Sequence, residues 1–181
     1  MLPRAPAIIL LLAAASLAAA QAVPDAEKGR ASLWAGAGYS QVQPDFGPNS
    51  MSGVAGFADV NFAHWSVEAN LRFLRFNSFH GETESSYLAG PRYFVFPMGR
   101  LRPFAGVLFG VGTIHYPFEI GNGSYFAYAP YGGAEARITR RVALRADYQY
   151  QFWPAAPGIA GEPSHGITPS GFSVGAIWRV F

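Results

Sequence analysis

A strict alternation of apolar and polar residues runs through positions 65–73, which read Trp-Ser-Val-Glu-Ala-Asn-Leu-Arg-Phe. Every second side chain from Trp65 to Phe73 is apolar, and the side chains between them are Ser, Glu, Asn and Arg. Positions 141–153 repeat the pattern in the order Arg-Val-Ala-Leu-Arg-Ala-Asp-Tyr-Gln-Tyr-Gln-Phe-Trp. Because successive side chains of a strand point to opposite faces, each stretch predicts a β-strand with one apolar and one polar face.

Six further segments fit the same period, although glycine and alanine blur the pattern in three of them. We predict eight strands, at residues 30–42, 52–62, 65–76, 83–96, 102–115, 124–138, 141–153 and 170–181. Each can supply the roughly 9–11 residues that a tilted strand needs to cross a bilayer. The connections alternate between long and short, as in membrane barrels with short periplasmic turns and longer external loops. The sequence therefore predicts an all-β fold, an eight-stranded antiparallel transmembrane up-and-down β-barrel.

The first 22 residues differ from the rest of the chain. Arg4 precedes an apolar run from Ala7 to Ala20, and small residues then fit a cleavage site after Ala20 or Ala22. The run is shorter than the ~20 apolar residues of a membrane-spanning helix. We therefore predict a secretory signal peptide at residues 1–22 and a barrel domain at residues 23–181.

The composition excludes several classes of protein. The chain has 181 residues and no cysteine, which excludes a disulfide framework, a thiolate nucleophile and a Cys-zinc site. Aromatic residues make up 15% of it, which argues against a disordered chain. The net charge is +2 and no basic run exceeds Arg140-Arg141, so nucleic acid is not an expected partner.

Charged residues make up only 13% of the chain, against about 25% in soluble domains. A soluble barrel of the lipocalin kind would turn its apolar face inward, whereas a membrane barrel turns it toward lipid. Six charged side chains on the polar faces would cost on the order of 10–20 kcal/mol if they faced lipid, against the ~5–15 kcal/mol stability of a domain. We therefore expect them to pair with one another in the lumen. The predicted polar network consists of Glu68, Arg72, Arg92, Glu135, Arg137, Arg145, Asp147 and Arg179, and it can extend to Asp59.

Aromatic residues near the strand ends are expected to form girdles at the membrane interfaces. They are Phe62, Trp65, Tyr93, Phe94, Phe96, Tyr150, Phe152 and Trp153.

One motif resembles a catalytic element. His64-Trp65-Ser66 matches the His-x-Ser element of outer-membrane lipid A deacylases, and Glu68 would complete a Ser/His/acid set. However, His64 lies in a predicted periplasmic turn, whereas those enzymes act at the outer leaflet, so we interpret it as a turn residue. The remaining histidines lie in or beside predicted external loops, at a spacing that fits no metal-ligand pattern; they are His80, His115 and His165. We predict no catalytic, cofactor-binding or metal-binding residue, and no cofactor.

The chain as a whole resembles the OmpA-like family of bacterial outer-membrane β-barrels. Three segments carry the resemblance: residues 87–93, Tyr-Leu-Ala-Gly-Pro-Arg-Tyr; residues 131–135, Tyr-Gly-Gly-Ala-Glu; and residues 147–154, Asp-Tyr-Gln-Tyr-Gln-Phe-Trp-Pro. The final strand also ends in Phe181, although Arg179 stands where members usually have an aromatic residue. The chain departs from the family in one further respect, since we expect a barrel alone, without a periplasmic peptidoglycan-binding domain. The resemblance implies a location in the bacterial outer membrane. It further implies two partners, outer-membrane lipid and the barrel-insertion machinery, the latter through the C-terminal strand.

These expectations describe a non-enzymatic envelope protein. It would brace the membrane or present the connections at 43–51, 116–123 and 154–169 to an unidentified partner outside the cell. Eight strands enclose a lumen that side chains fill, which excludes a wide pore and leaves a narrow conductance open. Two alternatives also stay open: an enzyme similar to lipid A deacylases, and an exported soluble lipid-binding barrel of the lipocalin kind.

Overall fold

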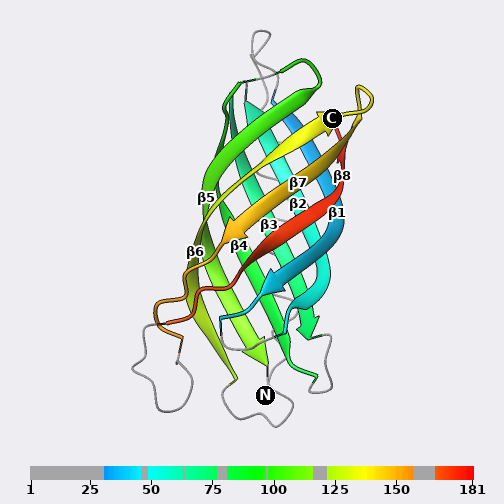
Figure 1. Ribbon diagram of the computed structural model, residues 1–181. Coiled ribbons are helices and arrows are strands. Elements are labelled where there is room, and N and C mark those ends of the chain that lie inside the picture. The colour runs from blue at the N-terminus through cyan, green and yellow to red at the C-terminus, as the bar shows by residue number, and fades with distance from the viewer. Residues whose placement is uncertain are drawn as a thin grey trace, which may run out of the picture. The chain divides into compact units, whose positions relative to one another are not determined.

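The computed structural model describes residues 31–45, 49–62, 64–76, 81–96, 98–115, 122–156 and 166–181. The predicted signal peptide lies outside the described residues. These residues form eight strands (Figure 1): β1 (Ser32–Gln43), β2 (Met51–Phe62), β3 (Trp65–Phe76), β4 (Thr83–Phe94), β5 (Leu101–His115), β6 (Gly123–Arg137), β7 (Val142–Tyr150) and β8 (Ser170–Arg179). No helix among the described residues is long and apolar enough to cross a membrane.

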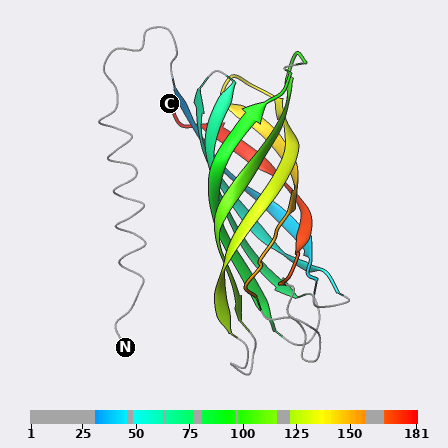
Figure 2. The ribbon, with the colours of Figure 1, turned by 90° about the vertical axis from the view of Figure 1, so that its left-hand side faces the viewer.

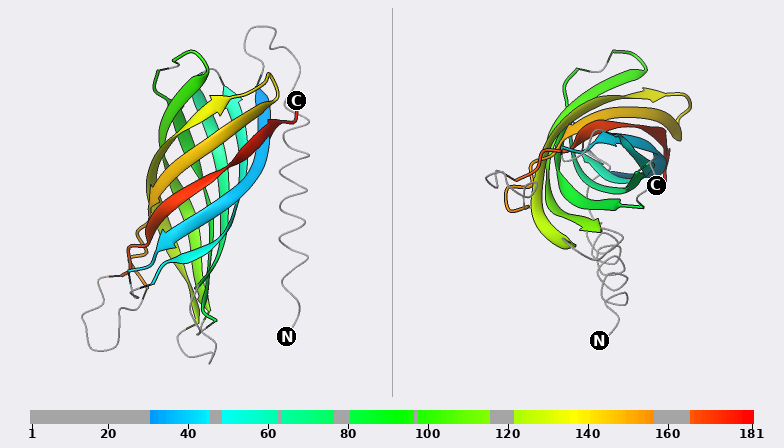
Figure 3. Two further views of the ribbon diagram at one scale, coloured as in Figure 1. Left: turned by 45° about the vertical axis from the view of Figure 1, so that its right-hand side comes forward. Right: turned by 60° about the horizontal axis from the view of Figure 1, so that its bottom comes forward.

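The strands close into a barrel in which each one pairs antiparallel with its neighbours in sequence. The closing ladder joins β1 to β8, from Trp34 opposite Arg179 to Gln43 opposite Ser170. Figure 2 shows the strands tilted against the long axis of the barrel, and the right-hand view of Figure 3 shows the closed wall. Closure removes the unpaired edges of an open sheet. The predicted eight-stranded antiparallel barrel is confirmed.

The barrel has two different ends. We call the end that carries the connections β2–β3, β4–β5 and β6–β7 the short-turn end; it lies at the top of Figure 1, where the C-terminus is marked. The opposite end, which we call the long-loop end, carries the other connections, including the long one between β7 and β8.

The observed strand limits differ from the predicted ones by a few residues. β4 ends at Phe94 because the chain then forms a tight hairpin, in which the backbone groups of Met98 and Leu101 exchange hydrogen bonds of 2.8 and 3.0 Å. Gly99 stands inside this turn with a φ of 62°, a conformation that favours glycine. β7 ends at Tyr150 because its ladder with β8 stops there, and Trp153 then forms an isolated bridge with Ile167.

The ladder between β6 and β7 is short. It runs from Tyr131 opposite Gln149 to Arg137 opposite Ala143, and it is interrupted at Pro130, which has no N–H to donate. The pairing resumes further on, where the backbone groups of Tyr128 and Phe152 exchange hydrogen bonds of 3.1 and 2.8 Å. Pro130 therefore explains why the continuous ladder between β6 and β7 is confined to the short-turn half of the barrel.

The apolar face of each strand points outward. In β3 the side chains of Trp65, Val67 and Phe73 are exposed, whereas Ser66 and Glu68 are buried inside the barrel. Large exposed hydrophobic side chains occur on all eight strands. The facing predicted for a membrane barrel is therefore confirmed, and the soluble lipocalin-like alternative, which needs the apolar face inside, is wrong.

Two of the expected girdle aromatics lie inside the barrel instead. Phe94 is 3% exposed and Trp153 is 0% exposed, whereas Phe62, Trp65 and Phe96 are exposed as expected. Phe94 shares its face of β4 with Arg92, and Trp153 continues the face of Gln149 and Gln151. The expectation for these two residues was wrong because it weighed their position near a strand end and not their alternation.

Candidate functional site

The most distinctive feature of the barrel is a cluster of ion pairs in its lumen, at the level of the short-turn half. Strand register brings the members together, since Asp59 on β2 lies opposite Glu68 on β3 and Glu135 on β6 lies opposite Arg145 on β7. All are on the inward faces of their strands. We call this set the lumen ion cluster; it consists of Asp59, Glu68, Arg72, Arg92, Arg102, Glu135, Arg145 and Asp147.

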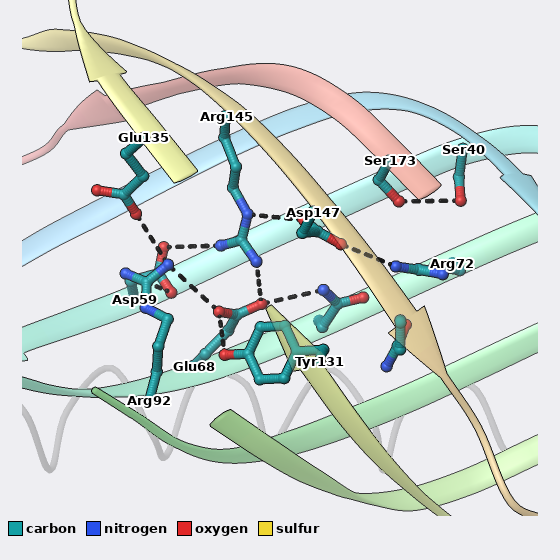
Figure 4. Close-up of polar contacts among 12 residues, drawn as sticks. Ser40, Asp59, Glu68, Arg72, Arg92, Tyr131, Glu135, Arg145, Asp147 and Ser173 are labelled. Carbon is teal, nitrogen blue, oxygen red and sulfur yellow. Dashed lines mark hydrogen bonds and ion pairs between the residues drawn. The ribbon is translucent and has the colours of Figure 1, made fainter. Parts of the chain in front are cut away.

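Glu68 is the centre of the cluster (Figure 4). Its Oε1 accepts hydrogen bonds from Arg145 Nη2 at 2.6 Å and from Asn70 Nδ2 at 3.0 Å. Its Oε2 accepts one from the hydroxyl of Tyr131 at 2.6 Å and lies 3.4 Å from Arg92 Nη1. Charge-assisted hydrogen bonds of this length are the stronger kind, so Glu68 ties four side chains to one another.

Two arginines each bridge three carboxylates. Arg145 lies 2.6 Å from Glu68, 2.9 Å from Asp147 and 3.5 Å from Asp59. Arg92 lies 2.8 Å from Glu135 and 3.4 Å from both Glu68 and Asp59. The two guanidinium groups therefore share their acids, and the cluster behaves as one network rather than as separate pairs.

The cluster balances its own charge. Arg72 and Arg102 complete it, at 3.0 Å from Asp147 and 3.8 Å from Glu135. The four arginines then face four carboxylates, all nearly or fully buried except for Arg102. A buried charge without a partner is costly, so this pairing lowers the cost of burying the eight groups. A fifth acid, Glu84, is also buried on the inward face of β4, outside these ion pairs.

Aromatic rings surround the guanidinium groups. The ring of Phe104 lies 4.7 Å from Arg92 and 4.9 Å from Arg145, measured from guanidinium carbon to ring centroid. The guanidinium carbon of Arg102 lies 3.7 Å from the centroid of the Phe94 ring. These distances are in the range of cation–π contacts. The rings replace part of the hydration that the arginines lose inside the barrel.

The structure brings six of the eight predicted network residues together. They are Glu68, Arg72, Arg92, Glu135, Arg145 and Asp147. Arg137 and Arg179 do not join them: both are exposed, and neither makes an ion pair among the described residues. Each shares the inward-facing frame of its strand, but each is the last residue of that strand, where the lumen opens to solvent.

The prediction lacked Arg102, a member of the cluster, and Tyr131, which donates a hydrogen bond to Glu68. Arg102 lies on the same face of β5 as the buried Phe104, and Tyr131 lies on the same face of β6 as Glu135. The alternation could have found both, although the glycines of β5 and β6 weakened the pattern there. Asp59 was considered only as an extension of the network, and it forms ion pairs with both Arg92 and Arg145.

Apolar side chains fill the lumen around the cluster and beyond it. Trp34, Phe57 and Ile177 pack together beside the cluster, where the ring of Phe57 lies 4.2 Å from the guanidinium carbon of Arg145. Toward the long-loop end, Trp153 lies among the buried residues of a larger group and donates a 2.8 Å hydrogen bond to Gln151 Oε1. The indole of Trp153 lies directly against Gly112, where any side chain would collide with it. The glycine is needed at this point of close approach.

The residues of the deacylase-like motif are not assembled for catalysis. Ser66 is buried on the inward face of β3, and its hydroxyl makes no hydrogen bond with a described residue. Glu68 is engaged by the arginines, while His64 is exposed and has the ring of Tyr93 6.4 Å away. His115 is exposed at the end of β5, and His80 and His165 lie outside the described residues. No group of three or more His, Cys, Asp or Glu side chains in the described part of the chain is arranged to hold a metal ion.

Comparison with known proteins identifies the family. The model of the outer membrane protein beta-barrel domain matches residues 7–179. No curated protein matches the sequence.

Three solved structures illustrate the likeness of fold. Neisserial surface protein A (NspA) has a TM-score of 0.65 and 12% identity, over 84% of this chain and 99% of that one. OprG from Pseudomonas aeruginosa has a TM-score of 0.58 and 10% identity, over 83% and 96%. Ail, the attachment invasion locus protein of Yersinia pestis, has a TM-score of 0.50 and 17% identity, over 83% and 98%.

At these identities the solved structures support the fold, while the family model covers nearly the whole chain. The outward apolar face, the closed eight-stranded wall and the inward charges agree with it. The chain belongs to the outer membrane protein β-barrel domain family, in keeping with its resemblance to OmpA-like barrels.

Proposed function

We propose that this outer-membrane barrel is a non-enzymatic envelope protein without an open aqueous pore. It anchors in the membrane and presents the connections β1–β2, β5–β6 and β7–β8 outside the cell. In outer-membrane barrels the short turns face the periplasm and the longer connections face outward, which assigns the long-loop end to the exterior. The observation that carries the proposal is that the inward side chains are buried in both the short-turn and the long-loop halves of the barrel.

Buried side chains fill both halves of the lumen. In the short-turn half, Trp34, Phe57 and Ile177 pack around the lumen ion cluster, with the ring of Phe57 4.2 Å from the guanidinium carbon of Arg145. In the long-loop half lies Trp153, whose indole is 0% exposed. An eight-stranded barrel has an interior just wide enough for side chains, so this filling leaves no room for a water-filled channel.

Conductance in planar lipid bilayers tests the absence of a pore. The purified barrel is first shown to be folded, by its different gel mobility before and after boiling. We expect no steady current steps from the wild type or from Trp65→Ala, a control that alters only a lipid-facing aromatic. Reproducible unitary steps from the folded wild type would refute the sealed lumen and support the narrow conductance considered from the sequence.

The non-enzymatic part of the proposal rests on Ser66, whose hydroxyl lies inside the barrel wall and away from the outer leaflet. In cells that express the protein, Ser66→Ala is expected to leave the acylation of lipid A unchanged. Mass spectrometry of extracted lipid A measures this. An extra acyl chain that appears only with Ser66→Ala would mean that Ser66 is a nucleophile, and the barrel would then be an enzyme.

We also propose that residues 1–22 direct export and that the C-terminal strand is read by the barrel-insertion machinery. The support for export is the composition of the segment, a basic residue followed by an apolar run and small residues. N-terminal sequencing of the protein from the outer membrane is expected to begin at Gln21 or Val23. A mature protein that still begins at Met1 would contradict it.

A further inference from the structure

Exposed arginines gather at the short-turn end of the barrel. Arg100 stands in the β4–β5 turn, Arg140 and Arg141 stand in the β6–β7 turn, and Arg137 and Arg179 end β6 and β8. All five are exposed. We call this set the rim arginines. The lumen ion cluster does not use any of them, and the proposed function gives them no role.

The rim arginines form one continuous arc. The backbone N–H of Arg137 donates to the carbonyl of Arg100 at 2.9 Å, and that of Arg179 donates to the carbonyl of Arg141 at 2.8 Å. Arg140 lies between the two pairs in the turn that joins β6 to β7. The arc therefore follows the ends of β5, β6, β7 and β8, which lie side by side at the top of Figure 1.

No exposed carboxylate side chain among the described residues faces this arc. The nearest acids by register, Asp59, Glu68 and Glu135, are buried and already paired in the lumen. The two acidic side chains outside the lumen, Asp45 and Glu82, lie at the long-loop end. Arg179 Nε donates to the main-chain carboxyl oxygen of Phe181, the last residue of the chain, at 3.3 Å. The side chains of the other four arginines make no hydrogen bond or ion pair with a described residue, so these four form a positive surface without internal neutralisation.

Apolar side chains border the arc on the lipid side. Leu101 follows Arg100, Ile138 follows Arg137, and Trp178 precedes Arg179; all are exposed by 41–55%. Leu144, three residues after Arg141, is also exposed. These apolar side chains point outward to lipid, whereas Arg137 and Arg179 share the inward frame and leave the barrel at its mouth. The arginines therefore stand just beyond the last lipid-facing side chains, at the height where bilayer headgroups begin, and their long stems can carry the charge to that level.

We propose that the rim arginines bind the phosphate groups of anionic phospholipids in the periplasmic leaflet of the outer membrane. The planar guanidinium group matches phosphate through paired hydrogen bonds, and the arc offers several such groups along one stretch of the rim. The opposite part of the rim, at the β2–β3 turn, carries His64 and Trp65 and no arginine. The preference for anionic lipid is therefore confined to one side of the barrel. This inference is independent of whether the lumen conducts.

The placement of two tryptophans allows a direct test. Trp178 is 49% exposed on the arc side, Trp65 is 58% exposed on the opposite side, and Trp34 and Trp153 are buried in the lumen. Brominated acyl chains quench a tryptophan that they touch. The Trp65→Phe variant therefore reports lipid at Trp178, and the Trp178→Phe variant reports lipid at Trp65. Each is reconstituted in vesicles that mix brominated phosphatidylglycerol or brominated phosphatidylcholine with the other lipid unbrominated.

At Trp178 we expect phosphatidylglycerol to be preferred over phosphatidylcholine by about 5-fold or more, the factor that corresponds to about 1 kcal/mol for one arginine near an anionic surface. At Trp65 we expect no preference. Replacing Arg100, Arg137, Arg140 and Arg141 by glutamine in the Trp65→Phe background should abolish the preference, whereas Arg75→Gln, an exposed arginine at the long-loop end, should leave it unchanged. The Arg140→Gln, Arg141→Gln double variant should weaken it and serves if the fourfold variant does not fold. Added salt should weaken the preference too.

Three outcomes would overturn the proposal. The first is no preference at Trp178, and the second is an equal preference at both tryptophans. The third is a preference that survives the fourfold substitution in a barrel that keeps its heat-dependent gel mobility. If the preference is absent and the protein instead sediments with purified peptidoglycan in a manner that needs the rim arginines, the partner is an anionic polymer and not the membrane.

Discussion

Replacing Arg145 with methionine tests whether the charges of the lumen hold one another in place. Methionine keeps an apolar stem and removes the guanidinium group, which lies 2.6, 2.9 and 3.5 Å from Glu68, Asp147 and Asp59. Each of these acids keeps another arginine, because Arg92 lies 3.4 Å from Glu68 and Asp59 and Arg72 lies 3.0 Å from Asp147. The cluster is therefore left with one uncompensated negative charge and not with three.

Breaking a buried ion pair by removing one partner costs about 3–5 kcal/mol. We expect the free energy of unfolding of Arg145→Met to fall by about this amount, a large part of the ~5–15 kcal/mol of a typical domain. Adding Glu68→Gln leaves three arginines and three acids. The double variant should therefore lose less than the sum of the two single losses, by about 1–3 kcal/mol.

The assay is urea-induced unfolding in phospholipid vesicles, followed by tryptophan fluorescence. Arg75→Met serves as the control, since Arg75 is exposed and makes no ion pair with a described residue; its unfolding free energy should stay within about 0.5 kcal/mol of the wild type. If Arg145→Met also stays within about 0.5 kcal/mol, or if the losses from Arg145→Met and Glu68→Gln simply add, mutual compensation does not stabilise the lumen and the reasoning fails.

Two further substitutions test the packing of the lumen and the facing of the wall. Gly112→Val should destabilise the barrel by about 1–3 kcal/mol in the same assay, because the new side chain meets the indole of Trp153; Gly56→Ala, with only ordinary contacts to Leu71, should not. An unchanged midpoint for Gly112→Val would show that Trp153 does not lie there. Ala69→Arg on the lipid-facing side of β3 should cost about 2–4 kcal/mol in vesicles, while Ala69→Leu should cost little. Equal midpoints for these two variants would mean that Ala69 does not face lipid.

Much of the fold follows from the sequence because one physical rule applies along the whole wall. A strand between lipid and a polar lumen must alternate, and β3 does so from Trp65 to Phe73 without a break. The limits of strands were harder to predict. Pro130 interrupts the ladder because it has no N–H to donate, and Met98 and Leu101 hydrogen-bond to each other within their turn. The alternation of side chains does not report such backbone effects.

The sequence predicted which side chains face the lumen, but it did not predict how far along the barrel axis each of them lies. The alternation correctly assigned Glu68 and Arg145 to the interior, but it assigned Arg137 and Arg179 there as well. The reason is that an alternating pattern does not show at which residue a strand reaches the end of the barrel. The alternation could not predict which charged side chains pair with one another. The hydroxyl of Tyr131 meets Glu68 across the lumen, and that contact depends on the register of every intervening ladder.

Quenching of the four tryptophans tests the central claim, a sealed polar lumen inside a lipid-facing apolar wall. The structure places Trp65 and Trp178 on the outside and Trp34 and Trp153 inside. Single-tryptophan variants are reconstituted in vesicles and exposed to brominated acyl chains and to aqueous acrylamide. We expect Trp65 and Trp178 to be quenched strongly by brominated chains, and Trp34 and Trp153 to be quenched only weakly by either agent. Strong quenching of Trp153 by acrylamide would mean an open lumen, and strong acrylamide quenching of Trp65 and Trp178 without quenching by lipid would mean that the apolar face does not meet the membrane.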